Sequence, residues 1–175
     1  IFNFFKPPLV YGPVSITTSP QIKSLMDILT AQEIQTKLLD NTKLKTAIWT
    51  KGVVNCCLNA LSALYLVKMN KLHDHSYIFT IVENIVNEAY NVAKSNGVDF
   101  NKSEVIEMVE MAPLNYSSMY KDIINGKDTE IDYLNGMIVK LGKDNGIDTD
   151  ENNKITILIN GLKDTIFLDN TLLCD

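Results

Sequence analysis

Asn-Gly pairs and a proline divide residues 42–170 into segments of helical length. The three pairs that we take as helix ends stand at 96–97, 125–126 and 145–146, and Pro113 lies between the first two of them. Glycine readily adopts the left-handed backbone that ends a helix, and proline cannot continue one. Within the segments, apolar residues recur three or four positions apart, which is the spacing of one helix face. The pattern predicts a mainly α fold, a compact bundle of six helices.

The bounds of these helices follow from the stops and from polar residues that can cap a helix start. Candidate N-caps are Asn41 or Thr42, Asn101 or Ser103, Thr129, and the pair Thr149–Asp150. We expect helices over residues 42–67, 75–95, 101–111, 115–124, 129–143 and 151–168. A bundle of this length can bury a substantial single core.

The first forty residues have a different character. A strand-like run at 10–16 is followed by a helix start at Ser19–Pro20 and an amphipathic stretch to Ala31, and residues 35–39 form a second candidate strand. Strand, helix and strand in succession are typical of an α/β unit. We therefore expect residues 1–40 to be the end of a preceding domain, and residues 41–175 to be a helical domain. Since the chain begins with Ile1 rather than methionine, we expect it to start partway through a longer protein.

Charge and composition narrow the classes of partner. The 175-residue chain has a formal net charge of −5, and all 16 basic residues are lysine. Arginine makes many of the planar contacts to phosphates and base edges, so we expect no nucleic-acid partner, although biased codon usage would also explain its lack. There is no run of 18 apolar residues and no secretory signal at the start, so we expect no membrane span.

The cysteines and histidines do not form a metal-binding pattern. Cys56, Cys57 and Cys174 lack the number and spacing of a disulfide framework, so we expect reduced thiols and a cytoplasmic protein. His73 and His75 flank Asp74 in a short polar link, where alternate residues are more often solvated than ligating. The sequence therefore predicts no resident metal.

The first predicted helix carries a polar row among apolar and small residues. Lys51, Asn55 and Asn59 are four residues apart and so lie along one helix face, with Ser62 one step further. The row could be a solvent face. A solvent face normally carries mixed charge, however, and no acidic residue occurs between Asp40 and Asp74. One ammonium with carboxamides would suit a pocket for an oxygen-rich, anionic ligand.

A second polar group follows Pro113. Asn115 and Ser118 stand at the predicted start of a short helix, where free N–H groups favour a carboxylate. Glu130 stands in the first turn of the next predicted helix, where its charge is also favoured. The simpler interpretation is that Ser118 and Thr129 only cap their helices.

Together these segments resemble the helical C-terminal domain of the ketopantoate reductase (2-dehydropantoate 2-reductase) family. The resemblance rests on the Lys-x3-Asn-x3-Asn row and on a Ser-Ser-Met-x2-Asp motif followed by Thr-Glu-Ile-Asp-x-Leu-Asn-Gly. It extends over about residues 30–160 through segments 48–64, 88–97, 117–122, 129–136 and 142–147.

The resemblance implies a two-domain enzyme that reduces ketopantoate to pantoate with NADPH, a step in pantothenate and coenzyme A synthesis. It implies a helical domain of the 6-phosphogluconate dehydrogenase-like type that closes over an N-terminal Rossmann domain. Residues 1–40 would be a short α/β remnant of that domain. By resemblance Lys51 is the proton donor to the ketone oxygen, and Glu130 lies where cofactor and substrate meet. Asn55 and Asn59 bind the substrate, and Asn115 and Ser118 hold its carboxylate and hydroxyl end.

Two departures from the family pattern matter. The family has an Asn-Gly turn after the first helix, whereas this chain has Lys68-Met69-Asn70-Lys71-Leu72, in which Asn70 is the candidate substrate-binding residue. No GxGxxG fingerprint occurs anywhere. NADP would therefore be held mainly by the domain that is missing here, and the chain alone is expected to be inactive.

Two other functions remain open at this stage. The chain could belong to a relative that acts on another 2-oxo acid, or it could be a non-catalytic helical module for oligomerisation or interaction. The expected partners are a small 2-oxo acid and the N-terminal Rossmann domain of the same protein. A second copy of the chain, forming a homodimer, is a further candidate.

Overall fold

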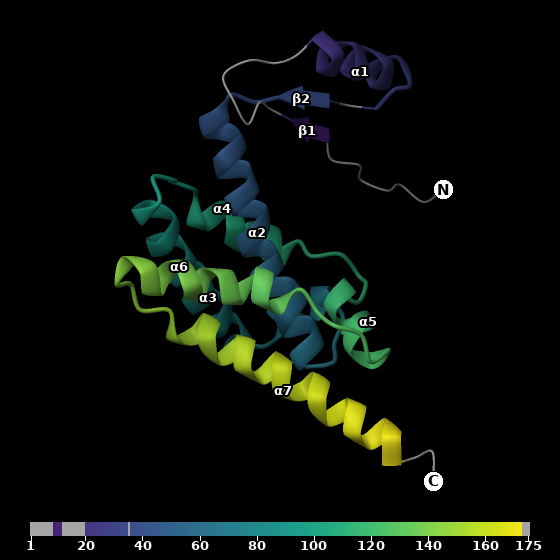
Figure 1. Cartoon of the computed structure of the whole chain (residues 1–175), viewed down its shortest axis with the longest axis vertical. Coiled ribbons are helices and arrows are strands. Elements are labelled where there is room, and N and C mark those ends of the chain that lie inside the picture. Colours follow the sequence, from purple (N-terminus) through teal and green to yellow (C-terminus); the bar gives the residue numbers. More distant parts are fainter. Residues whose placement is uncertain (1–8, 12–19, 35, 173–175) are drawn as a thin grey trace. The chain divides into compact units, whose positions relative to one another are not determined.

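The computed structural model describes residues 9–11, 20–34 and 36–172 (Figure 1). The chain divides into two compact units, which we call the N-terminal unit (1–48) and the C-terminal unit (49–175). The boundary falls within helix α2 (Asn41–Leu64). The predicted domain boundary after residue 40, and the origin of residues 1–40 in a nucleotide-binding domain, stay predictions.

The N-terminal unit contains a strand, a helix and a strand. Strands β1 (Leu9–Tyr11) and β2 (Thr36–Leu38) pair in parallel, with Leu9 opposite Thr36, and α1 (Pro20–Ala31) connects them in sequence. Two neighbouring parallel strands require a crossover connection, which α1 supplies. The predicted strand–helix–strand order is therefore confirmed, while residues 12–16 and 35 of the predicted strands lie outside the described residues.

The remainder of the chain is mainly α, as predicted. Six α-helices and two 3-10 turns follow one another from residue 41 to residue 172. They are α2, the turn η1 (Met69–Asp74), α3 (Ser76–Ser95), α4 (Lys102–Glu110), α5 (Ser118–Ile124), the turn η2 (Ile131–Tyr133), α6 (Asn135–Asn145) and α7 (Asp150–Leu172). None of the described helices is long and apolar enough to cross a membrane.

Helix α2 is shorter than predicted, and its cap is a different residue. Asp40 Oδ1 accepts the Lys43 N–H at 2.8 Å, so Asp40 rather than Asn41 or Thr42 caps the helix. The helix ends at Leu64 instead of Val67 because Leu66 has a positive φ of 56°. The Ser62 hydroxyl then donates to the Val67 carbonyl at 2.7 Å and holds the reversed chain.

The predicted helix over residues 129–143 is wrong, because the chain breaks at Leu134. The backbone of Leu134 has φ −103° and ψ −99°, which no helix accommodates. Thr129 Oγ1 accepts the Ile131 N–H at 3.5 Å, so this residue supports the short turn η2 instead of starting a long helix. Helix α6 begins only at Asn135.

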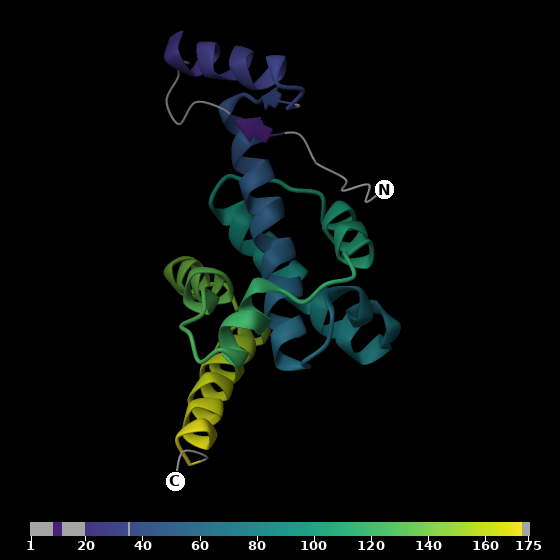
Figure 2. The ribbon, with the colours of Figure 1, turned by 90° about the vertical axis from the view of Figure 1, so that its right-hand side faces the viewer.

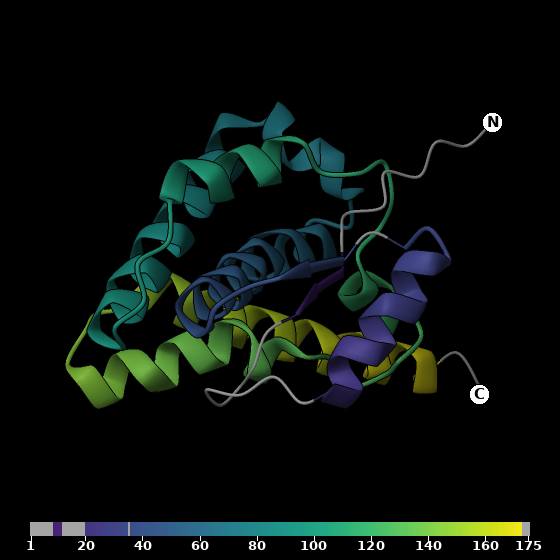
Figure 3. The ribbon, with the colours of Figure 1, turned by 90° about the horizontal axis from the view of Figure 1, so that it is seen from above.

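Helix α2 is the centre of the C-terminal unit. In Figures 2 and 3, α4 lies to one side of α2, and α6 and α7 lie to the other. Helix α3 contacts α4, α6 and α7, so it joins the two sides. Residues on several faces of α2 are consequently buried, including Val53, Cys57, Ala60, Leu61 and Ala63, each with no exposed surface.

Candidate functional site

The polar row on α2 is present, and its side chains are unpaired. Lys51 is exposed, and Asn55 and Asn59 are half-buried between the apolar residues of the helix. None of the three side chains forms a hydrogen bond or an ion pair with any residue that the structure describes. The row therefore offers one cation and two carboxamides to a ligand.

The loop before α5 is bonded to the end of this row. The Ser117 hydroxyl donates to the Asn59 carbonyl at 3.2 Å, and the Ser117 N–H donates to the Ser62 hydroxyl at 3.4 Å. The Met69 N–H donates to the Asn115 carbonyl at 2.9 Å, which adds the first residue of η1. These bonds bring the backbones of four predicted site residues into one neighbourhood: Asn59, Asn70, Asn115 and Ser118.

Ser118 is not a helix cap, which corrects the simpler interpretation of this residue. Ser117 is the N-cap of α5, and its oxygen accepts the Tyr120 N–H at 3.1 Å. Ser118 is the first helical residue and is exposed. Its hydroxyl bonds to none of the described residues, so it is available to a ligand.

Asn70 is the predicted site residue that lies on η1, and it is half-buried. Its Oδ1 is buried without a hydrogen-bond partner among the described residues. A neighbouring aromatic stack stiffens the same region: the Tyr116 and Tyr120 rings lie 4.1 Å apart at 16°, and the Lys68 ammonium lies 5.8 Å from the Tyr116 centroid. This stack was not predicted from the sequence, although the four-residue spacing of the two tyrosines could have indicated it.

Glu130 lies directly before η2 rather than in the first turn of a helix. Its backbone carbonyl accepts the N–H groups of Tyr133 and Leu134 at 3.0 and 3.1 Å, and its side chain is exposed. The turn is fixed in the core by Ile131, which has no exposed surface. A single cleft shared by Glu130 and Lys51 stays a prediction.

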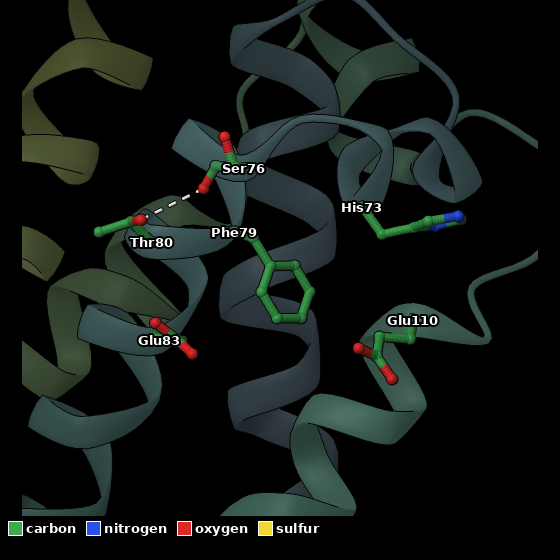
Figure 4. Close-up of a pocket in the computed structure, with 6 residues that line it drawn as sticks. All are labelled: His73, Ser76, Phe79, Thr80, Glu83 and Glu110. Carbon is green, nitrogen blue, oxygen red and sulfur yellow. Dashed lines mark hydrogen bonds between the residues drawn. The ribbon is translucent and has the colours of Figure 1, made fainter.

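A cavity of about 460 Å³ lies elsewhere, between η1, α3 and α4 (Figure 4). Glu83 and Glu110 stand on its opposite walls, and the Phe79 ring points between them. Its other lining residues are His73, Ser76 and Thr80, so none of the predicted site residues contributes. Because its two carboxylates would repel a 2-oxo acid, the cavity is a poor site for such a ligand.

The two cysteines on α2 are structural. Both thiols are free and buried, and burial raises the pKa of Cys56 to about 12 and that of Cys57 well above its usual value. The thiolate is the reactive form of cysteine. Neither residue is therefore a candidate nucleophile, although both adjoin the polar row.

Comparisons of this chain with a family model and with individual known proteins agree on one family. Residues 43–163 match the family described as ketopantoate reductase PanE/ApbA C terminal. The chain is 31% identical over 125 residues to 2-dehydropantoate 2-reductase of Pyrococcus abyssi, covering 70% of this chain and 41% of that protein. It is 31% identical over 151 residues to the Lactococcus lactis enzyme of the same name, covering 82% of this chain and 48% of the relative. The chain thus spans less than half the length of these relatives.

Solved structures with the same fold carry two kinds of name. D-mandelate dehydrogenase, in a ternary structure with NADH and anilino(oxo)acetate, is 31% identical with a TM-score of 0.81. The alignment covers 90% of this chain and 66% of that one. A PanE/ApbA family ketopantoate reductase from Ralstonia eutropha JMP134 is 29% identical with a TM-score of 0.76, covering 90% of this chain and 51% of that one.

Proposed function

This chain belongs to the ketopantoate reductase family through its C-terminal domain, and we propose that it is the substrate-binding half of an NADPH-dependent 2-dehydropantoate 2-reductase. The observation that carries the proposal is the unpaired row Lys51–Asn55–Asn59, whose far end is bonded to the loop that bears Asn115 and Ser118. One free cation beside several free amides and a hydroxyl matches a small, oxygen-rich anion.

Lys51 is the proposed proton donor. Hydride addition to the ketone carbon places negative charge on the ketone oxygen, and an ammonium group near that oxygen stabilises the charge and supplies the proton. Lys51 suits this task because no described acidic residue pairs with it and its amine is exposed. A guanidinium would release a proton far less readily.

The remaining site residues are proposed to orient the substrate. The amides of Asn55 and Asn59 would bind it beside Lys51, and Asn115 with Ser118 would hold its carboxylate and hydroxyl end. Asn70, on the adjoining turn η1, would add one more amide. Fixing the substrate in this way lowers the entropic part of the barrier to hydride transfer.

The nucleotide would be held mainly outside this chain. A bound nicotinamide cofactor supplies the hydride in reductases of this kind. No GxGxxG loop occurs among the eight glycines, so the chain offers no glycine-rich cradle for the pyrophosphate. Glu130 is the residue of this chain that we propose to reach the cofactor, and a preceding Rossmann domain would supply the other contacts.

Reduction of another 2-oxo acid is the second candidate. It is favoured by the likeness to D-mandelate dehydrogenase, whose TM-score of 0.81 exceeds that of the Ralstonia eutropha ketopantoate reductase. That protein was solved with NADH, so the choice between NADPH and NADH belongs to the same question. That the complete protein forms a homodimer stays a prediction, which light scattering would test.

The deciding experiment is a turnover screen of the complete protein. Ketopantoate and phenylglyoxylate are each tested with NADPH and with NADH, and kcat/KM is compared across the four pairs. We expect the highest value for ketopantoate with NADPH. A higher value for phenylglyoxylate would favour the second candidate, and no turnover of either keto acid would refute both.

A further inference from the structure

A chain of buried polar groups joins α2 to α6, α7 and α3. Asn135, the first residue of α6, and Asn152, in the first turn of α7, have no exposed surface. Asn135 Nδ2 donates to the Cys56 carbonyl of α2 at 3.3 Å and to Asn152 Oδ1 at 3.0 Å. Asn152 Nδ2 donates in turn to the Glu88 carboxylate of α3 at 2.7 Å.

Glu88 determines which group donates and which accepts in each of these hydrogen bonds. Its carboxylate accepts the N–H groups of Glu151 and Asn152 at the start of α7, at 2.8 and 2.9 Å. A carboxylate can only accept, so Asn152 must present its amide nitrogen to Glu88 and its oxygen to Asn135. Asn135 must therefore donate to Asn152, and the second hydrogen of the same nitrogen is directed at Cys56.

The two ends of the Asn135 connection lie beside proposed site residues. Cys56 directly follows Asn55 and lies between Lys51 and Asn59 along α2. Asn135 follows Glu130 by five residues, and only η2 and Leu134 lie between them. The Glu130 carbonyl accepts the N–H groups of Tyr133 and Leu134, and we call residues 130–134 the Glu130 turn. The bond from Asn135 to Cys56 thus ties the Glu130 turn to the helix that carries the polar row.

Asn135 is a poor choice for stability alone. Its Oδ1 is buried without a partner among the described residues, and an unmade hydrogen bond in the core is unfavourable. A buried amide with a fixed direction specifies one arrangement of its neighbours, which an apolar residue of similar size does not.

We propose that Asn135 is a positioning residue, which holds the Glu130 turn at a fixed place on α2 so that Glu130 acts together with the polar row. The inference rests on the proposed function. Asn135 itself touches no substrate and acts through Glu130.

The test compares Asn135→Leu with Asn160→Leu in the complete protein. Asn160 is the matched control, since its Nδ2 also joins α7 to η2, at Asp132 Oδ1 and 3.2 Å, but in an exposed pair without a bond to α2. Each substitution is made in the wild type and in Glu130→Gln, and kcat and KM for ketopantoate are measured, or for phenylglyoxylate if that is the better substrate.

We expect Asn135→Leu to lower kcat by about 10–100-fold in the wild type, by analogy with the loss of residues that orient the ligands of a metal site. In the Glu130→Gln background the same change should cost less than about 3-fold, because the residue it positions is already altered. Asn160→Leu should change kcat by less than about 2-fold in either background. Equal losses from Asn135→Leu in the two backgrounds, or no loss in either, would overturn the proposal.

An activity-independent measurement separates this proposal from the function. Hydrogen exchange of the Tyr133 and Leu134 N–H groups, which bond to the Glu130 carbonyl, should accelerate at least about 10-fold in Asn135→Leu and not in Asn160→Leu. A wild type that reduces neither keto acid refutes the function, while unchanged exchange refutes the positioning role.

If Asn135→Leu does not fold, Glu88→Gln serves instead, because an amide can donate or accept and the fixed direction is lost. The same two readouts apply, and unchanged kcat and exchange in that variant would also overturn the proposal.

Discussion

The Ser117 hydroxyl lies 3.2 Å from the carbonyl oxygen of Asn59 and donates a hydrogen bond to it across 58 residues of sequence. The same hydroxyl oxygen accepts the Tyr120 N–H and so caps α5. One side chain therefore starts the short helix and attaches it to α2. The hydroxyl of the adjacent Ser118 bonds to no residue in the described part of the chain, and this difference separates a structural serine from a proposed ligand-binding one.

Replacement of Ser117 should consequently lower the stability of the fold, whereas replacement of Ser118 should weaken substrate binding. Ser117→Ala removes a cap and a tertiary bond, so the free energy of unfolding should fall by about 1–2 kcal/mol. Ser118→Ala should change that free energy by less than about 0.5 kcal/mol, because an exposed, unpaired hydroxyl contributes little to the fold. It should instead raise KM for the keto acid. Urea unfolding and steady-state kinetics measure the two effects, and a stability loss in Ser118→Ala would contradict the assignment.

Two helical glycines offer a paired test of the face that carries the site. A Cβ added at Gly52 or Gly161 would meet nothing within 4 Å, and both glycines lie inside helices. Gly→Ala at either position should therefore stabilise the protein by about 0.5–1 kcal/mol. Gly52 follows Lys51, so its open space is where we expect substrate or cofactor to lie.

The glycine pair should differ in activity. We expect Gly52→Ala to lower kcat/KM, and Gly161→Ala, on α7, to leave it unchanged. Thermal unfolding and kinetics of the two variants check this. Equal activity in both would place the site away from this stretch of α2.

The ion pair between Asp128 and Lys163, near the Glu130 turn, should depend on pH. Lys163 Nζ lies 2.6 Å from Asp128 Oδ1, and its hydrogen bond and charge lower the pKa of the Asp128 carboxyl below its usual value. A carboxyl with a lowered pKa stabilises the fold above its unfolded pKa, and the contribution is lost as pH falls through the folded pKa. In NMR titrations the pKa of Asp128 should rise in Lys163→Gln. Because the pair is exposed, the difference should shrink in high salt.

Sequence patterns predicted most helix bounds, because the signals for them are local. The C-terminal end of α3 follows from Asn96 and from Gly97, whose φ is 73°, and the start of α4 follows from Asn101, which accepts the N–H groups of Ser103 and Glu104. The start of α7, predicted at residue 151, lies at Asp150, but its strongest contacts are not local. Its first N–H groups bond to Glu88, more than sixty residues earlier.

The candidate site was predictable only in part, for the same reason. The spacing of Lys51, Asn55 and Asn59 places them on one helix face. Their nearness to Asn115 depends on the Ser117–Asn59 and Met69–Asn115 bonds, which no spacing in the sequence encodes. The Leu134 break, which sets Asn135 against Cys56, likewise depends on packing between distant segments.

Kinetics of Lys51 variants in the complete protein test the central claim most directly. We expect Lys51→Ala to lower kcat by about 10²–10⁴-fold, the range for loss of a positioned general acid, and Lys51→Arg not to restore it. Asn59→Ala should act mainly through KM, since the contacts it makes change little as charge develops on the ketone oxygen. Lys140→Ala, which removes an exposed lysine of α6, is the control and should retain wild-type kcat. A Lys51→Ala enzyme with near wild-type kcat would contradict the claim and leave the α2 row as a binding surface only.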